Sequence, residues 1–309
     1  MRNESDFYLG VGHRVRQAAI CYAILIPSLL LLTVFVYVPV TWAFIGSLFR
    51  FEVGGASEFV GLDNFVDFLF KDPVTWPAFG NMIFLTFFAV CVRLTVPLVV
   101  AKFIHSVPKE RYRYFYRIVF LIPIVVPGVA IQLIWGGLVY AEHGIVNETL
   151  RALGLESWTQ GWLSNPQTAL FAVACIGFPF VGGFDVLIYY AGLSNIPESV
   201  HEAAWLEGCS GVKKFFLIDI PMVMSQLKLI LILTIIGGFQ GFEGLFILTR
   251  GGPGFKTTVP GLWMYLNAFS FQRMGYACAI GVVLFVLIFG LTLLNFRYFK
   301  STEQLESGS

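Results

Sequence analysis

Six apolar segments, each long enough to cross a lipid bilayer, set the strongest limit on how this chain can fold. A helix that spans the hydrocarbon core of a membrane needs about 20 predominantly apolar residues. We therefore predict an all-α membrane protein with six transmembrane helices. The predicted spans are Ala18–Phe49, Asn81–Phe103, Ile118–Tyr140, Thr168–Gly192, Leu217–Leu248 and Tyr276–Arg297.

The composition also indicates that a lipid bilayer surrounds the chain. Hydrophobic residues make up 57% of the chain and charged residues only 13%, against roughly 25% charged residues in a soluble domain. So much apolar surface cannot be hidden in one water-soluble core, and we expect the bilayer to cover it. The net charge of +1 gives no sign of nucleic-acid binding. The five cysteines form no C-x-x-C pair, which argues against a disulfide framework or a zinc site.

Basic residues predict the orientation, because Lys and Arg gather in cytoplasmic loops. If the N-terminus is cytoplasmic, the inside segments hold most of the Lys and Arg residues, including the cluster Lys109–Arg117. We therefore expect both termini in the cytoplasm. The predicted organisation is an N-terminal segment over 1–17, a six-span domain over 18–300 and a tail over 301–309 that resembles a cloning remnant.

The loop between the fourth and fifth predicted spans, residues 195–216, contains a short polar helix and then a glycine. Asn195 is suited to cap this helix. Ala203 and Ala204 leave a low surface that another protein can approach, and Gly208 permits a sharp change of chain direction. An ordinary amphipathic helix at the membrane interface is the simpler alternative.

Within this loop, Glu202-Ala203-Ala204-Trp205-Leu206-Glu207-Gly208 precedes Phe215, Phe216, Ile218, Ile220 and Pro221. The pattern resembles the EAA loop of permease subunits of ABC importers, where a glycine follows three residues after EAA and I-x-L-P comes later. The resemblance implies a coupling loop that contacts a cytosolic ATPase. Its coupling residues would be Glu202, Ala203, Ala204, Glu207 and Gly208. Glu207, Cys209 and Ile220 depart from the usual Asp, Ala and Leu, but Glu207 keeps the charge.

Other segments resemble carbohydrate importer permeases related to the larger permease subunit of the maltose transporter. They are Arg117–Pro123 with Val126–Gly128, Gly144–Asn147 with Trp162–Leu163, and Phe246–Pro253. The resemblance implies a type I ABC importer in a bacterial or archaeal cell membrane, with this chain in a heterodimer with a second permease subunit. Two cytosolic ATPase subunits would bind ATP and Mg, and an extracellular solute-binding protein would deliver the carbohydrate. The chain has no G-x-x-x-x-G-K-[ST] loop, so we expect neither a cofactor nor enzymatic activity in it.

Polar and small residues in the fifth predicted span suggest a sugar path, because polar groups inside a membrane normally face the bundle interior or a cavity. These residues are Thr234, Gly237, Gly238, Gln240, Gly241, Glu243 and Gly244. Gln240 and Glu243 are three apart and are expected near one helix face. Close packing of helices at small residues is the alternative explanation.

Resemblance to the maltose permease implies further positions on the substrate path. They are Ile124 and Gly128 in the third span, Gly177, Phe180, Val181 and Phe184 in the fourth, and Thr234, Gly237, Gly238 and Gly241 in the fifth. Most are small or apolar where the relative has polar or bulky groups, which suggests a roomier cavity for an oligosaccharide. The predicted polar contacts are Gln132, Asp185, Gln240 and Glu243, and the predicted stacking rings are Phe180, Phe184 and Phe239.

Two alternatives stay open. The same machinery could import another solute, such as glycerol phosphate or a peptide, although a phosphate would favour basic cavity residues and only Arg93 and Lys228 are available. Asp185 and Glu243 could instead form the proton path of a secondary transporter. Arg93 is more readily explained as an ion-pair partner or a snorkelling residue than as a sugar ligand. The four histidines lack metal-ligand spacing, so no metal site is predicted.

Overall fold

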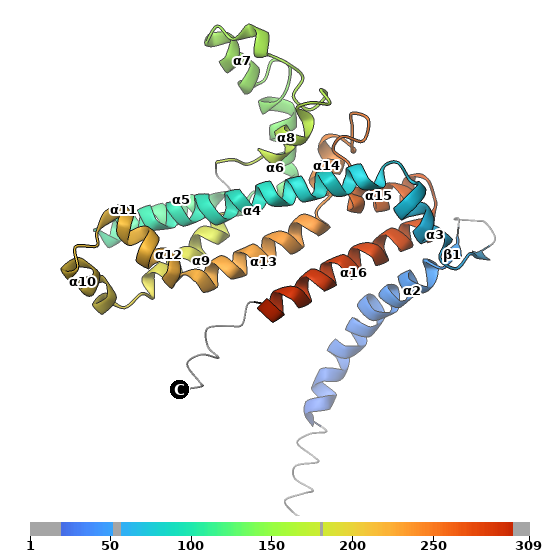
Figure 1. Cartoon of the computed structure of the whole chain (residues 1–309), viewed down its shortest axis with the longest axis horizontal. Helices are drawn as coiled ribbons and strands as arrows, with labels where there is room; N and C mark the ends of the chain where they lie inside the picture. The colour runs from blue at the N-terminus through green and yellow to red at the C-terminus, as the bar shows by residue number, and fades with distance from the viewer. Residues whose placement is uncertain (1–19, 52–56, 180–181, 299–309) are drawn as a thin grey trace, which may run out of the picture.

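The structure is a computed structural model that describes residues 20–51, 57–179 and 182–298. Three long helices, α4 (Thr75–His105), α13 (Met224–Gln240) and α16 (Met274–Tyr298), run along the long axis, and α13 packs against both others (Figure 1). The first long helix, Ile20–Gly46, ends in α2 (Val38–Gly46), which contacts α16. Away from this contact the first helix diverges from the bundle (Figure 1).

Shorter elements connect the long helices. They are β1 (Phe49–Arg50), β2 (Glu58–Phe59), α3 (Asp63–Val66), α5 (Glu110–Leu121), α6 (Gly128–Ile134), α7 (Ile145–Ala152), α8 (Ala169–Ala174), α9 (Gly183–Ser194), α10 (Glu198–Leu206), α11 (Gly211–Lys214), α12 (Ile220–Met222), α14 (Glu243–Leu248) and α15 (Pro260–Tyr265). The 3-10 turns are η3 (Ile122–Val125) and η5 (Glu156–Trp158). The π-helical turns are η1 (Thr33–Tyr37), η2 (Asp67–Lys71), η4 (Trp135–Val139), η6 (Phe215–Asp219) and η7 (Leu266–Ser270).

Three of the predicted spans are confirmed as continuous helices long and apolar enough to cross a membrane. They are Ile20–Gly46, Thr75–His105 and Met274–Leu294. The third and fifth predicted spans are bent pairs, with 85° between Glu110–Val125 and Gly128–Val139 and 69° between Gly211–Met222 and Met224–Gln240. By length and composition the described residues therefore provide three spans, or up to five if each bent pair crosses once.

Proline and glycine explain where the third and fourth predicted spans break. Val126 precedes Pro127 and has an extended backbone with ψ of 124°, as expected for a residue that a following proline keeps out of the helical region. The fourth predicted span is not one helix, because α8 ends at Ala174 and α9 begins only after Gly182, whose φ is 77°. The predicted terminal segments, 1–17 and 301–309, lie outside the described residues.

Two hydrophobic cores lie along the bundle, and α4 contributes buried residues to both. The first joins the beginning of α4 to α15 and α16, with Met82, Leu262 and Ile280 almost fully buried. The second joins the end of α4 to α9 and α13, with Ala101 and Tyr189 almost fully buried. Helix α4 is therefore the element that connects the two ends of the bundle.

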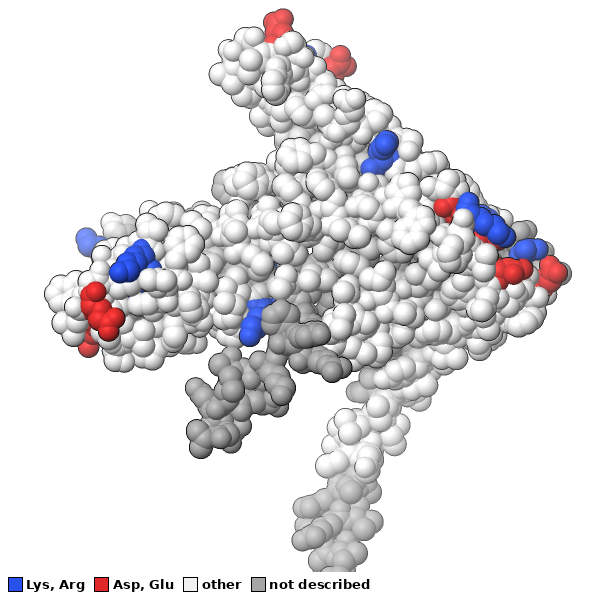
Figure 2. Space-filling view, viewed as in Figure 1, with Lys and Arg blue, Asp and Glu red and all other residues white. Residues whose placement is uncertain are grey.

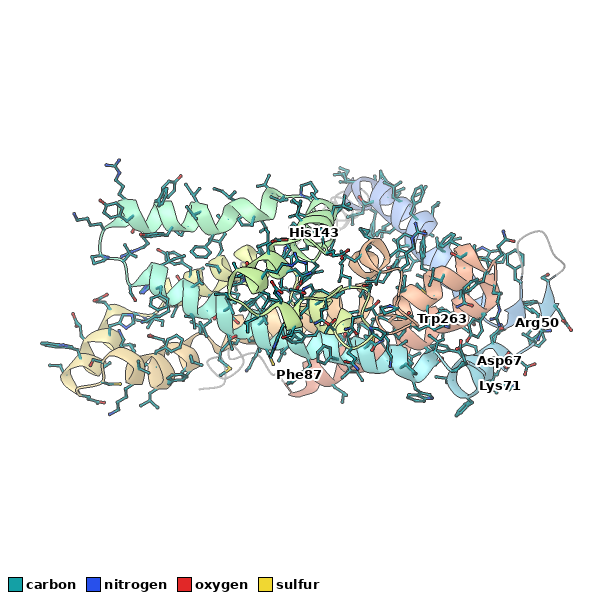
Figure 3. The ribbon with its side chains drawn as sticks, turned by 90° about the horizontal axis from the view of Figure 1, so that it is seen from above. Arg50, Asp67, Lys71, Phe87, His143 and Trp263 are labelled. Carbon is teal, nitrogen blue, oxygen red and sulfur yellow. The ribbon has the colours of Figure 1, made fainter. Side chains whose placement is uncertain are left out.

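The end of the bundle that carries the β-hairpin is fixed by buried polar contacts. Oδ2 of Asp72, just before α4, accepts hydrogen bonds from Trp263 Nε1 at 2.7 Å and from the Tyr276 hydroxyl at 2.5 Å. Figure 3 shows Trp263 with Asp67 and Lys71 towards this end, whereas Phe87 lies farther along α4. The start of α4 is thereby held against α15 and α16.

Charged side chains leave the middle of the visible surface mostly clear. Lys, Arg, Asp and Glu gather near the two ends of the long axis and on the lobe that contains α7, with mostly uncharged surface between them (Figure 2). A band of this kind is what a helical bundle presents to the hydrocarbon core of a membrane.

Candidate functional site

The coupling loop (residues 195–216) forms the end of the bundle opposite the β-hairpin, where α10 and α11 lie (Figure 1). Gly208, between these two helices, has a φ of 70°, a left-handed conformation that a residue with a Cβ adopts only at a cost. A Cβ added at Gly208 would meet no atom within 4 Å. The backbone conformation alone therefore favours glycine, and the expected change of chain direction is present.

The start of α10 differs from the sequence prediction. Asn195 was expected to cap this helix, and that expectation is wrong. Asn195 instead ends α9, where its N–H donates to the Ala191 and Gly192 carbonyls. Helix α10 begins at Glu198 after Pro197, whose ψ of 142° turns the chain into the new helix, and no side chain caps it.

Most of the predicted coupling residues lie on the exposed surface of α10 and the turn after it. Glu202, Ala203, Glu207 and Gly208 are exposed, whereas Ala204 is only 4% exposed. The expectation that both alanines form the approachable surface is therefore wrong for Ala204. Ala204 is therefore covered by the rest of the chain rather than presented to a partner.

We did not predict from the sequence that large apolar side chains of the coupling loop would be exposed. Trp205 and Leu206 are 75% and 80% exposed, and Val212 on α11 is similarly exposed. The available signal was the presence of large apolar residues inside an otherwise polar loop. Exposed apolar side chains gathered at one place mark a surface that contacts another protein or a membrane.

Arg93 of α4 and Asp185 of α9 form a two-pronged ion pair. Arg93 Nε lies 2.6 Å from Asp185 Oδ2, and Arg93 Nη2 lies 2.8 Å from Oδ1. The Asp185 side chain is 1% exposed. The prediction that Arg93 is an ion-pair partner is confirmed. Both carboxylate oxygens of Asp185 are engaged, so binding a sugar or carrying a proton through Asp185 would first require this buried pair to open.

The fifth predicted span breaks near its polar residues. Helix α13 ends at Gln240, Gly241 has an extended backbone, and α14 begins at Glu243. The expectation that Gln240 and Glu243 share one helix face is therefore wrong, because they belong to different helices. Both side chains are exposed.

Two other fifth-span positions serve packing in this structure. Thr234 is buried and its hydroxyl donates to the Ile230 carbonyl at 2.7 Å. A Cβ added at Gly238 would lie 2.9 Å from Thr86 Cγ2 on α4, so the glycine allows α13 and α4 to approach closely. Gly237 is exposed, and a Cβ there would meet nothing within 4 Å.

A cavity of about 210 Å³ lies beside Gln132 of α6. Its lining consists of Gln132, Val173, Ile176, Phe242, Gly244 and Leu245. Gln132 Oε1 is buried and has no hydrogen-bond partner among the residues that the structure describes, and such a group normally finds one. A ligand in the cavity could reach this oxygen only if the amide turned, whereas the Phe242 ring offers the cavity an apolar face. Phe242 was not among the predicted site residues.

The remaining predicted path residues are dispersed. Ile124, Gly128 and Phe184 are exposed, and Phe239 packs against the first core. Gly177 has a φ of 82° in the turn that follows α8. Phe180 and Val181 lie outside the described residues.

A lobe between the third and fourth predicted spans contains α7 and stands off the bundle (Figure 1). Buried Asn147 organises it. Asn147 Nδ2 donates to the carbonyls of Ala141, Glu142 and Gln160, and its Oδ1 accepts from Trp162 Nε1 at 2.8 Å and from the Gln160 N–H at 3.3 Å. His143, labelled in Figure 3, places its Nδ1 3.5 Å from Oε1 of Glu148 on α7. The predicted Gly144–Asn147 and Trp162–Leu163 segments are thereby brought together.

Among the described residues, no three His, Cys, Asp or Glu side chains come together in a way that could hold a metal ion.

Comparison with known proteins assigns a family. Residues 94–300 match the family described as binding-protein-dependent transport system inner membrane component. The Bacillus subtilis protein named "Probable ABC transporter permease protein YurN" is 30% identical over 92% of this chain and 97% of its own length. The arabinooligosaccharides transport system permease protein AraP of Bacillus subtilis is 31% identical over 89% of this chain and 87% of its own length.

The fold also has a close counterpart among solved structures. A chain in the structure of a bacterial alginate ABC transporter, in complex with an alginate pentasaccharide-bound periplasmic protein, superposes with a TM-score of 0.82. The sequence identity is 20%, and the match covers 93% of this chain and 96% of that chain. At this identity the likeness establishes the fold alone.

Proposed function

Because the chain belongs to the family of binding-protein-dependent transport system inner membrane components, we propose that it is a permease subunit of an ATP-driven carbohydrate importer. The coupling loop carries this proposal, because its exposed α10, left-handed Gly208 and protruding apolar side chains form a docking surface at one end of a membrane bundle. A relative named for arabinooligosaccharides and the alginate transporter structure support carbohydrate as the substrate class.

We place both termini and the coupling loop in the cytoplasm and count six spans, with the segment Thr168–Gly192 crossing as two helices separated by a break. The basic cluster Lys109–Arg117 begins just beyond the end of α4, at the end of the bundle that carries the coupling loop. Positive residues favour the cytoplasmic side, so this placement agrees with docking of a cytosolic ATPase.

The partners follow from that arrangement. A second permease subunit completes the translocation path, and two cytosolic ATPase subunits, which bind ATP and Mg, dock on the coupling loops. An extracellular solute-binding protein delivers the sugar to the opposite side. ATP-driven closure of the ATPases would pull on Glu202–Gly208 and turn the path from inward-facing to outward-facing, and hydrolysis would return it.

The sugar path is proposed to run past the cavity beside Gln132. Gln132, after rotation of its amide, and the Phe242 ring would provide the polar contact and the apolar face that a sugar ring requires. The absence of a side chain at Gly244 leaves room for the Gln132 amide, because a Cβ there would lie 2.8 Å from Gln132 Nε2. Gly237, Gln240 and Glu243 remain candidates for further contacts.

Other solutes and a proton-coupled carrier are the competing functions. A glycerol phosphate importer would require basic side chains along the path, but Arg93 is paired with Asp185. A proton relay through Asp185 is disfavoured for the same reason, since both of its carboxylate oxygens are held by Arg93. An uptake that collapses with an uncoupler at constant ATP would favour the carrier.

The proposal is tested by purifying the tagged chain from its native membrane in mild detergent and identifying the proteins that accompany it. One ATPase, a second permease and a solute-binding protein are expected. Replacing Trp205 and Leu206 together by Ser should release the ATPase, whereas Phe70→Ser, at an equally exposed site on η2 near the hairpin end, should not. A chain that transports without any ATPase would refute the proposal.

A further inference from the structure

A buried ion pair joins the end of α4 to the segment that directly follows the coupling loop helices. Lys102 Nζ lies 2.5 Å from Asp219 Oδ2. The Asp219 side chain is 1% exposed and the Lys102 side chain 25% exposed. Asp219 is the last residue of η6, the π-helical turn that continues from α11. The pair thus connects two segments 117 residues apart in the sequence.

Asp219 depends on Lys102 for compensation of its charge. Its other oxygen, Oδ1, is buried and has no hydrogen-bond partner in the described part of the chain. Removing one partner of a buried ion pair leaves an uncompensated charge and is strongly unfavourable, whereas an exposed pair contributes little. The contact is therefore a firm link between α4 and η6 rather than an incidental surface interaction.

A second contact connects the last turn of α4 to α10 itself. The rings of His105 on α4 and His201 on α10 have centroids 6.5 Å apart. His105 also lies 6.1 Å from the Tyr190 ring of α9. His201 is the residue immediately before Glu202 of the EAA sequence. The final turn of α4 therefore touches the coupling loop region at both α10 and η6.

Farther from the coupling loop, α4 also contacts α9 and α13. Leu98 and Ala101 pack in the second core with residues of α9 and α13. Arg93, nine residues before Lys102 and so about 14 Å along the helix, holds Asp185 of α9. Two ion pairs on α4 thus link the segment after the coupling loop to α9. Helix α9 forms the second part of the fourth predicted span.

We propose that Lys102 and Asp219 are positioning residues for energy coupling, which fix α4 to the coupling loop so that the two move as one body. The inference rests on the proposed function, since it assumes that ATPases act on this loop. It adds the route by which their movement reaches α4 and, through Arg93–Asp185, α9. Neither residue is expected to touch ATP, an ATPase or the sugar.

The test uses the assembled complex in nanodiscs, with the binding protein purified together with its endogenous ligand. Lys102→Met should retain basal ATP hydrolysis but lower the stimulation by the binding protein about tenfold, within the range of typical coupling factors. The charge-swapped pair K102D/D219K should restore much of the stimulation. Glu110→Gln, which breaks exposed ion pairs with Arg113 and Arg117 near the same end, is the control and should change nothing.

Normal stimulation in Lys102→Met, or a swapped pair no better than the single variants, would overturn the proposal. If the Lys102 and Asp219 variants fail to assemble into a complex, a distance measurement with the ion pair intact tests the proposal instead. Spin labels at the exposed positions Ser106 and Phe216 should keep the same distance in the nucleotide-free complex and in the complex trapped with ADP and vanadate. A distance that changes between the two states would mean that α4 and η6 move separately.

The outcomes separate the two proposals. Absence of a co-purifying ATPase would refute the proposed function before any variant is made. A complete complex with a movable or dispensable Lys102–Asp219 contact would refute only the coupling route.

Discussion

Gly238→Ala should destabilise the bundle, because the added methyl group collides with Thr86 of α4. The new Cβ would lie 2.9 Å from Thr86 Cγ2 and 3.0 Å from Thr86 Cβ, and it would also contact Oγ1. Thr86 is buried and β-branched, so it has few rotamers with which to yield. Overpacking typically costs about 1–3 kcal/mol, while alanine in a helix gains about 1 kcal/mol over glycine.

We therefore expect a net loss of about 1 kcal/mol of stability, read as a lower midpoint of thermal unfolding in detergent by tryptophan fluorescence. Gly237→Ala is the matched control, since a Cβ at that neighbouring position meets nothing within 4 Å. It should leave the midpoint unchanged or raise it. Thr86→Ala in the Gly238→Ala background should recover stability, because it removes the Cγ2 and Oγ1 atoms. Equal midpoints for the two glycine variants would refute the packing argument.

Three further perturbations follow from the same contacts. Arg93→Met should cost about 3 kcal/mol because it leaves buried Asp185 uncompensated, and a thermal midpoint equal to that of the wild type would contradict this. Gly208→Ala should cost about 1 kcal/mol locally and reduce ATPase stimulation in the complex, while the unfolding midpoint of the bundle barely moves; unchanged stimulation would show that the left-handed turn is dispensable. Asn147→Ala removes hydrogen bonds worth about 1 kcal/mol each and should expose the α7 lobe to limited proteolysis, with the rest of the chain still protected.

The sequence predicted the continuous spans well, because hydropathy is a local property that is summed over one helix. It failed where a span breaks, since an average over 20 residues does not register one extended residue such as Val126 before Pro127. It identified Arg93 as an ion-pair residue but could not give its partner, because Asp185 lies 92 residues away. The motif predicts that residues 195–216 form a coupling loop, and this stays a prediction. The burial of Ala204 depends on how α10 packs, which the motif does not specify.

The breaks themselves argue for where the path runs. Backbone that leaves the helical form at membrane depth is tolerated only where protein buries it or where it lines a water-filled cavity. The cavity beside Gln132 receives its lining from α6, from the end of α8 and from the Gly241 break with α14. These are the three interrupted segments, while the unbroken α4 and α16 contribute nothing to its lining. The unbroken α4 thus contributes to both cores and to both ion pairs, whereas the interrupted segments line the cavity that we propose as part of the sugar path.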